Sequence, residues 1–288
     1  MRAAALMHPR ADRRLPARFP GAEIAEMLPP GCEAALVFGG DGTMHRHLRA
    51  LVEAGVPALN VPTGSGNDFA HALGLHTISD AERAWKQFLE TRDNVRDIDV
   101  AEIRSPSTQS PAPSPLFCCI AGVGLDSEVN RRANAMPGWL RRHGGYVLAL
   151  LPALAAFRAP QVSAEVLDAA NGETIARISE PAMLCAFANA PAYGDGMRMA
   201  PRAKLDDGLL DVCFVRRVGK LRLLRLFPKV FSGAHLSLEP VRYLHAARLR
   251  VESTPPLDIY ADGEFVARTP AEIVVQSKAL RVIVVPEH

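Results

Sequence analysis

Two short apolar runs in the N-terminal part of the chain each end in a glycine-rich turn that opens a helical pattern. The first run, Ala34–Phe38, is followed by the turn Gly39–Thr43 and then by apolar residues at helical spacing. The second run, Val56–Val61, leads through the turn Pro62–Ala70 into another helical pattern. Strands that alternate with helices pair in parallel, and such open sheets bind ligands at the carboxyl ends of their strands. The pattern therefore predicts a small doubly wound α/β domain with both turns side by side at one sheet edge.

The first turn has the composition of a phosphate-binding loop. Gly39, Gly40 and Gly42 allow backbone N–H groups to approach an anion closely, and the following helix N-terminus favours negative charge. Asp41 would repel a phosphate unless a metal ion or a proton lies between them. Two structural alternatives stay open: the glycines serve only tight packing, and Asp41 only caps the helix that starts at Thr43.

The expected secondary structure changes near Val95: strands and helices alternate before it, and strands predominate after it. The dipeptide Asn171-Gly172 is typical of a tight hairpin between two of these strands. The expected strands are Leu116–Ile120, Val162–Leu167, Thr174–Ile178, Met183–Ala188, Leu210–Val215, Ala247–Glu252, Leu257–Ala261, Ile273–Gln276 and Leu280–Val285. This part is therefore predicted to form an antiparallel β-sandwich or barrel.

The length of 288 residues allows two domains, which we expect at residues 1–95 and 96–288, with the alternative that the last strand returns to the first domain. The net charge of +2 gives no reason to expect a nucleic-acid partner. The stretches 129–164 and 212–238 contain basic but no acidic residues, which fits anionic lipid headgroups and equally fits solvated helices.

A helical pattern at Lys220–Phe231 carries Arg222, Arg225 and Lys229 on one stripe, opposite a broad apolar face. We expect the apolar face to pack on the sheet and the basic stripe to face outward, although a helix lying in a membrane interface would show the same pattern. A helix is also expected at Gly144–Arg158, too short to span a membrane.

The five cysteines do not form a metal-binding or disulfide pattern. Cys118 and Cys119 are adjacent and are predicted to point to opposite faces of a strand. Buried reduced thiols and the lack of a signal peptide fit a cytoplasmic protein that approaches the inner face of a membrane from one side.

The ordered motifs of the chain resemble those of the diacylglycerol kinase catalytic-domain family of lipid kinases. Gly39–Thr43 matches the family's G-G-D-G-T turn, and Pro62–Ala70 matches its P-x-G-T-x-N-D-F-A turn with Ser65 for threonine. Later matches are Gly122–Asp126, Asn189–Met197, Leu205–Val212 and Asp262–Glu264. The family's N-P-x-S-G turn is altered, because His8 and Ala11 replace its asparagine and serine.

The resemblance implies a phosphofructokinase- or NAD-kinase-like first domain, a β-sandwich second domain, and transfer of the γ-phosphoryl group of ATP to the hydroxyl of a lipid such as diacylglycerol. It places Mg²⁺ on Asp41, and Glu264 as the base with Asp262 in support, although the division between these two carboxylates stays open. The expected nucleotide-binding residues are Gly39, Gly40, Asp41, Gly42, Thr43, Ser65 and Asn67.

A second, structural magnesium site is implied near the Asp206-Asp207-Gly208 turn. The Asp207 carboxylate and the carbonyl groups of Lys204 and Leu209 would supply its oxygen ligands, and Asp126 would join the two regions through solvent.

Two alternatives remain at this level: an NAD-kinase-like enzyme with a soluble acceptor, and a lipid-binding protein that has lost nucleotide binding, as the altered turn at His8 and Ala11 would allow. The partner in the leading interpretation is a lipid presented at a membrane surface, with peripheral contact only. The sequence does not define which lipid is used or the oligomeric state.

Overall fold

The computed structural model describes residues 1–106, 113–136, 145–194 and 196–285, and the chain divides into two compact units. Unit 1 holds Met1–Val100, Leu205–Asp207 and Gln276–His288, and unit 2 holds Ala101–Lys204 and Gly208–Val275. Residues 107–112 and 137–144, which include part of the first basic stretch, lie outside the described residues.

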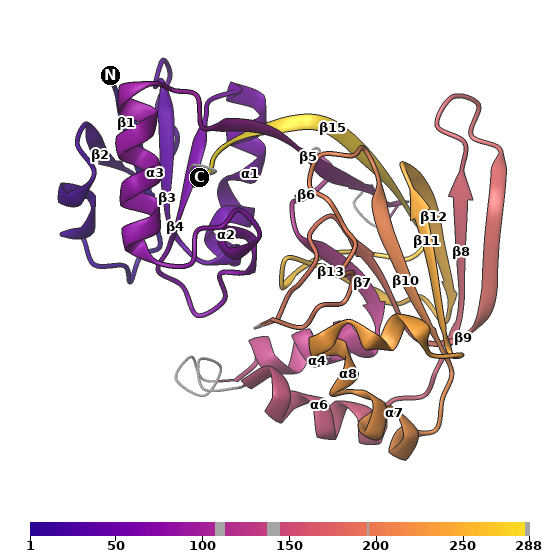
Figure 1. The fold of residues 1–288 in the computed structure, drawn as a ribbon. Helices are drawn as coiled ribbons and strands as arrows, with labels where there is room; N and C mark the ends of the chain where they lie inside the picture. The colour runs from indigo at the N-terminus through magenta and orange to yellow at the C-terminus, as the bar shows by residue number, and fades with distance from the viewer. Residues whose placement is uncertain (107–112, 137–144, 195, 286–288) are drawn as a thin grey trace. The chain divides into compact units, whose positions relative to one another are not determined.

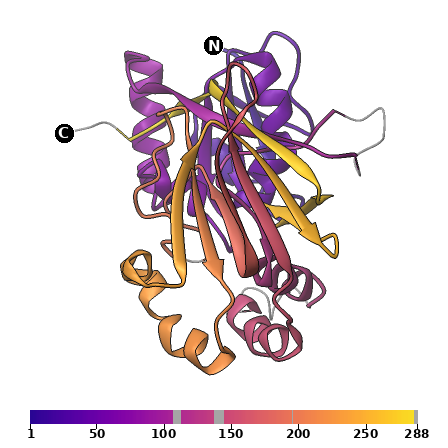
Figure 2. The ribbon, with the colours of Figure 1, turned by 90° about the vertical axis from the view of Figure 1, so that its right-hand side faces the viewer.

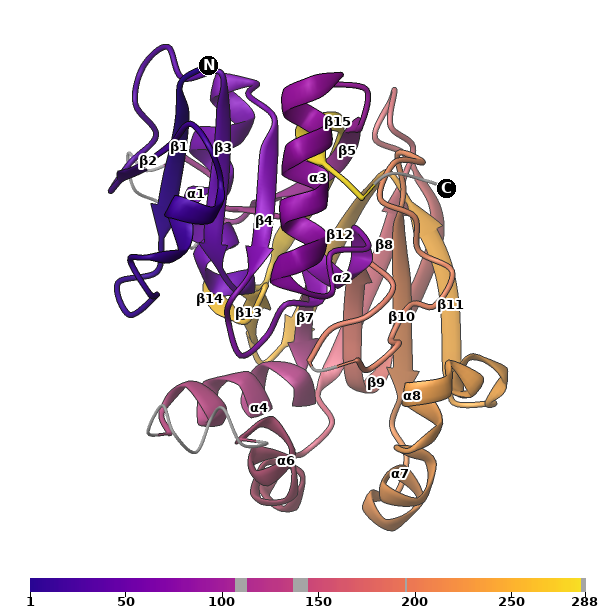
Figure 3. The same ribbon diagram turned by 60° about the vertical axis from the view of Figure 1, so that its left-hand side comes forward.

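Unit 1 is built on a parallel sheet, as the alternation of strands and helices predicted. Its strands are β1 (Ala3–Met7), β2 (Ala22–Ala25), β3 (Ala34–Gly39) and β4 (Ala58–Pro62), in the order β2-β1-β3-β4. Strand β3 is buried along its whole length because helices cover both faces of the sheet. Helix α1 (Asp41–Ala54) lies on one face and α3 (Ile78–Glu90) on the other (Figure 3).

Unit 2 is an antiparallel β-sandwich (Figure 1). Its core consists of buried aliphatic and aromatic side chains, among them Phe117, Phe187 and Phe214. Its strands are β5 (Val95–Arg104, which begins in unit 1), β6 (Leu116–Phe117), β7 (Ile120–Gly124), β8 (Gln161–Leu167), β9 (Thr174–Ala188), β10 (Leu210–Arg216), β11 (Val241–Ala246), β12 (Arg248–Thr254), β13 (Asp258–Ala261), β14 (Glu264–Arg268) and β15 (Ala271–Ile283, which ends in unit 1).

Strand β9 joins the two layers of this sandwich. Its first half pairs with β8, and its second half pairs with β7 and β10. The prediction of two separate strands here was wrong, because the chain stays extended through Pro181, where it passes from one layer to the other. The two predicted C-terminal strands are likewise one strand, β15, with Lys278 at a φ of 53° inside it.

Two further element predictions were wrong for local reasons. The predicted strand Leu116–Ile120 is broken by a bend at Cys118 and Cys119, which separates β6 from β7. The predicted helix Lys220–Phe231 is divided into α7 (Lys220–Leu226) and α8 (Lys229–Ser232), because Pro228 interrupts its hydrogen-bond ladder.

The helices of unit 2 gather at one end of its strands, as Figure 2 shows from the side. They are α4 (Leu125–Asn134), α6 (Gly145–Ala156), α7, α8 and the 3₁₀ turn Ala234–Ser237. The Lys220 ammonium donates to the Ala155 carbonyl (2.6 Å) and so links α7 to α6. Within the described part of the chain, every helix is too short or too polar to cross a bilayer.

Candidate functional site

The two glycine-rich turns of unit 1 are in direct contact. The Asp41 N–H donates to the Gly66 carbonyl (3.2 Å), which joins the start of α1 to the second turn. A Cβ atom on Gly40 would lie 2.1 Å from the Gly66 oxygen, and one on Gly64 would lie 2.4 Å from the Gly40 Cα. Only glycine permits this approach, so tight packing is one reason for the glycines.

Asp41 is the first residue of α1, but its carboxylate serves the other helix. It accepts hydrogen bonds from the backbone N–H groups of Asp68 (3.2 Å) and Phe69 (3.0 Å), at the start of α2 (Asp68–Ala72). The cap position of α1 is Gly40, which has no side chain to bond. The structural alternative, that Asp41 only caps its own helix, is therefore wrong, and its role as a magnesium ligand stays a prediction.

The second turn holds its shape through Asn67, whose Oδ1 accepts from the Gly64 N–H (3.0 Å) and whose Nδ2 donates to the Gly64 carbonyl (3.1 Å). Ser65 is exposed at the tip of the turn. The Thr63 hydroxyl is buried and has no hydrogen-bond partner among the described residues. A buried hydroxyl in this position fits a phosphate oxygen or a hydrated cation, and we had not singled out Thr63 from the sequence.

The altered turn at His8 and Ala11, which precedes both glycine-rich turns, is held by hydrogen bonds to its own histidine. The His8 Nδ1 accepts from the Arg10 N–H (3.1 Å), and the His8 carbonyl accepts from the Ala11 N–H (2.8 Å). A histidine nitrogen therefore makes the local bond that an asparagine oxygen makes in an Asx turn. Replacement of the asparagine leaves this turn hydrogen-bonded.

In unit 2, the Asp262–Glu264 segment is a two-residue hairpin between β13 and β14. Asp262 and Gly263 have φ values of 50° and 85°, as a type I′ turn requires. The Asp262 carboxylate accepts three backbone N–H groups, from Cys118 (3.1 Å), Cys119 (2.9 Å) and Ile120 (3.2 Å). Glu264 begins β14, and its side chain is exposed to solvent. The Asp262 carboxylate is therefore half-buried and bonded to the backbone, whereas the Glu264 carboxylate faces solvent.

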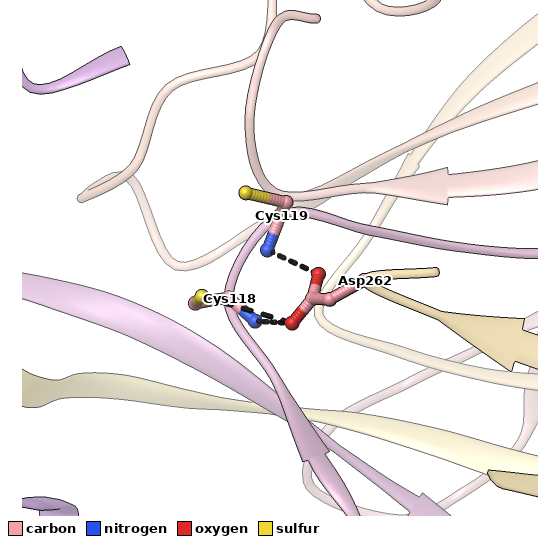
Figure 4. A group of neighbouring side chains, drawn as sticks. All are labelled: Cys118, Cys119 and Asp262. Carbon is pink, nitrogen blue, oxygen red and sulfur yellow. Dashed lines mark hydrogen bonds between the residues drawn. The ribbon is translucent and has the colours of Figure 1, made fainter. Parts of the chain in front are cut away.

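The bend that Asp262 holds is fixed from the other side by Asn189. The Asn189 Nδ2 donates to the Cys118 carbonyl (2.9 Å), and the Asn189 N–H donates to the Cys119 carbonyl (2.8 Å). The prediction that Cys118 and Cys119 point to opposite faces of a strand was wrong, because the chain bends there. Both sulfur atoms and a carboxylate oxygen of Asp262 lie within 4.8 Å of one another (Figure 4).

Helix α4 connects this hairpin to a second carboxylate. At its C-terminal end the Asn134 Nδ2 donates to the Gly263 carbonyl (2.8 Å). At its N-terminal end Asp126, which is 5% exposed, accepts from the Tyr193 hydroxyl (2.7 Å). A Cβ on Gly122 would lie 2.9 Å from the Asp126 Oδ2, so the glycine leaves room for this carboxylate.

Asp126 and Tyr193 also line an apolar pocket that is partly open to solvent. The pocket lies between α4, α6 and α7, and its only other polar side chain among the described residues is His235. The apolar face predicted for the basic helix lines this pocket, and no residue of α7 is fully buried. Burial lowers the pKa of His235 below its ordinary value of 6.5, which favours the neutral imidazole.

The loop around Asp207 is the segment in which the motifs imply a structural magnesium site. Lys204 and Asp207 are exposed, and the Leu205 carbonyl accepts from the Asp99 N–H (2.6 Å). Ligation by Asp207 and by the carbonyl groups of Lys204 and Leu209 stays a prediction.

Comparison with known proteins assigns both parts of the chain. Residues 17–103 match the diacylglycerol kinase catalytic domain, and residues 119–284 match the YegS C-terminal NAD kinase beta sandwich-like domain. A diacylglycerol kinase of Mycobacterium tuberculosis is 34% identical, over 90% of this chain and 79% of that protein. A diacylglycerol kinase of Bacillus subtilis is 25% identical, over 86% of this chain and 77% of that protein.

A solved structure of a diacylglycerol kinase from Bacillus anthracis shares the fold, with a TM-score of 0.67 at 19% identity over 99% of this chain and 97% of that one. The identity to the mycobacterial enzyme and the match of the second domain over more than half of the chain go further than a shared fold. The chain therefore belongs to the diacylglycerol kinase catalytic-domain family of lipid kinases.

Proposed function

We propose that this protein transfers the γ-phosphoryl group of ATP, with Mg²⁺, to the hydroxyl group of a lipid such as diacylglycerol. The observation that carries the proposal is the double attachment of α4: Asp126 at its start lines the apolar pocket, and Asn134 at its end bonds the Asp262–Glu264 hairpin. One rigid helix thus sets a pocket suited to an acyl chain at a fixed place relative to an exposed carboxylate.

We assign nucleotide binding to unit 1. The N-terminus of α1 and its glycine turn would hold the phosphates, and the buried Thr63 hydroxyl, which has no protein partner among the described residues, would add a donor. Ser65 would add a contact at the exposed tip of the second turn, while Asn67 keeps that turn in shape. Magnesium bound at Asp41 would neutralise phosphate charge during transfer.

We assign lipid binding and proton transfer to unit 2. Glu264 is the proposed base, because it is exposed and can reach a substrate hydroxyl. The hydroxyl oxygen forms a bond to the γ-phosphorus, the bond to the β,γ-bridging oxygen breaks, ADP leaves, and the hydroxyl proton passes to Glu264. Asp262 is proposed as a positioning residue, because its carboxylate is occupied by three backbone N–H groups.

Peripheral contact with the inner face of a membrane would bring the pocket to its substrate. The helices around the pocket expose large apolar side chains, namely Leu148, Leu151, Leu221 and Phe231. Arg222, Arg225 and Lys229 are exposed on the same helices and would meet anionic headgroups. We therefore propose that this helical end of unit 2 lies against the bilayer.

The test is transfer of labelled phosphate from ATP to a panel of lipids in mixed micelles, with and without Mg²⁺. Glu264→Gln should abolish transfer to every lipid, and Glu252→Gln, a matched change at an exposed carboxylate on β12, should not. Transfer to a soluble nucleotide acceptor in place of lipids would favour an NAD-kinase-like activity. Lipid binding without nucleotide binding would leave only a non-catalytic role.

A further inference from the structure

Unit 2 contains a second pocket, which helix α4 separates from the apolar one. Asp126 and Val129 of α4 line the apolar pocket, whereas Ser127, Glu128 and Arg131 line the second. At about 100° per residue these two sets lie on opposite faces of the helix. The other walls of the second pocket come from the end of α6, the loop before β13 and the end of β14. A ligand in the second pocket therefore lies beside α4 without entering the apolar pocket.

Charged side chains line this second pocket, which we call the arginine pocket. They are Glu128, Arg131, Arg158, Asp258 and Arg268. Hydrogen bonds from Arg131 (2.8 Å) and Arg132 (2.6 Å) lower the pKa of Glu128 below its ordinary value of 4.5, so this carboxylate is charged at neutral pH. The Asp258 Oδ1 accepts from the Arg268 Nε (2.6 Å). Both carboxylates are therefore balanced by guanidinium groups, and the pocket keeps an excess of positive charge.

Two arginines of the arginine pocket still have donors to offer. Arg158 is exposed and makes no hydrogen bond or ion pair with the part of the chain that the structure describes. Arg131 uses Nε and Nη2 on Glu128, and its Nη1 has no partner among the described residues. A guanidinium group presents its N–H donors in a planar fork that matches the oxygen atoms of a phosphate. The pocket therefore has the charge and the donor groups to bind a phosphate.

The position of the arginine pocket indicates what this phosphate is attached to. The pocket lies at the end of the strands where α4 and α6 are found (Figure 3). Helix α6 exposes Leu148 and Leu151, and Arg158 comes two residues after Ala156, the last residue of this helix. Exposed apolar side chains near an arginine are typical of a segment that meets both the acyl chains and the headgroups of a bilayer. A phospholipid therefore fits this position better than a phosphate ester in solution.

We propose that the arginine pocket binds the phosphate group of an anionic phospholipid, a different molecule from the lipid that is phosphorylated. Arg131 and Arg158 donate to the phosphate oxygens, and the acyl chains stay in the bilayer beside Leu148 and Leu151. This inference rests on the proposed contact of the helical end of unit 2 with a membrane. Because α4 lines both pockets, a headgroup bound here holds the apolar pocket at the bilayer surface.

Binding is tested with the full chain, without ATP, by flotation with vesicles of phosphatidylcholine that contain or lack phosphatidylglycerol. Arg158→Gln should weaken binding to the anionic vesicles by about 10-fold or more, as expected for the loss of a hydrogen bond to a charged group. Arg250→Gln, a matched change at an exposed arginine of β12 that does not line the pocket, should bind like the wild-type protein. Equal binding by Arg158→Gln and the wild-type protein would overturn the proposal.

Two further comparisons separate a pocket from surface charge alone. Arg158→Lys keeps the charge but loses the planar fork, so it should bind anionic vesicles about 3-fold or more weakly than the wild-type protein. Ala156→Gln places a neutral side chain in the pocket and should also weaken binding, whereas Ala155→Gln, at an exposed residue outside the pocket, should not. Full binding by Arg158→Lys, or equal binding by the two glutamine variants of α6, would overturn the pocket as the site.

The source of the phosphate and the proposed function have separate readouts. If glycerol phosphate binds in calorimetry through Arg158 while anionic vesicles do not bind, the pocket takes a soluble phosphate ester and the phospholipid assignment is overturned. If vesicle binding depends on Arg158 but no lipid is phosphorylated, the proposed function fails while the phospholipid site stands. If lipids are phosphorylated but anionic vesicles bind no better than neutral ones, the phospholipid site fails while the proposed function stands.

Discussion

Replacement of Asp262 by asparagine should separate anchoring from catalysis. The amide can keep one oxygen toward the N–H groups of Cys119 and Ile120, but its NH₂ group then faces the N–H of Cys118. One charge-assisted bond is lost, worth about 1.5–3 kcal/mol, and a half-buried donor is left unpaired at a cost of about 1–3 kcal/mol. We expect Asp262→Asn to lower the free energy of unfolding by about 2.5–6 kcal/mol.

The matched variant is Glu264→Gln, which changes an exposed side chain and should leave the free energy of unfolding within about 0.5 kcal/mol of the wild-type value. Both variants should lose phosphoryl transfer, but only Asp262→Asn should shift the midpoint of urea unfolding. An unchanged midpoint for Asp262→Asn would refute the anchoring role. A midpoint for Glu264→Gln that falls equally would refute the division of roles between the two carboxylates.

Three further changes test separate parts of the structure. Gly40→Ala puts a Cβ against the Gly66 oxygen, so it should lower the free energy of unfolding by about 1–3 kcal/mol. The variant should also bind nucleotide more weakly in calorimetry. Nucleotide binding as tight as that of the wild-type protein would contradict the contact between the two turns. Tyr193→Phe leaves the buried Asp126 carboxylate without its 2.7 Å donor and should cost about 1–3 kcal/mol in urea unfolding, a cost that Asp126→Asn should reduce in a double-mutant cycle. Because burial lowers the pKa of His235 below 6.5, the unfolded chain binds this proton more readily, so stability falls as pH drops below 6.5. His235→Phe should make unfolding free energies less dependent on pH between about pH 7.5 and pH 5.5, and an unchanged slope would contradict the shift.

Local patterns predicted the architecture well where local forces decide it. The buried runs at β3 and β4 are both specified by neighbouring residues. The strand predictions were wrong where tertiary pairing overrides a local signal. Proline usually interrupts a strand, but β9 continues through Pro181. The strand changes its pairing partner there, from β8 before Pro181 to β10 after it.

The sequence motifs did not predict the hydrogen bonds that their residues make within each unit. Asp41 was expected to bind magnesium, which stays a prediction, and the hydrogen bonds that its carboxylate accepts from the start of α2 were not predicted. The bond from Tyr193 to Asp126 and the grouping of Cys118 with Asp262 join segments more than sixty residues apart. Spacing along one chain carries no signal for such contacts, so they required the fold.

Because strand β15 is made late in synthesis, the parallel sheet of unit 1 can be completed only after most of the chain has been translated. Residue Val282 of β15 pairs with Ala58 of β4, so the edge of the parallel sheet in unit 1 waits for a segment made more than two hundred residues later. At ordinary rates of translation this interval is roughly 10–45 s. A ribosome-bound chain therefore carries an uncovered, apolar β4 edge for that time, and holdase chaperones that protect such edges should raise the yield of folded protein.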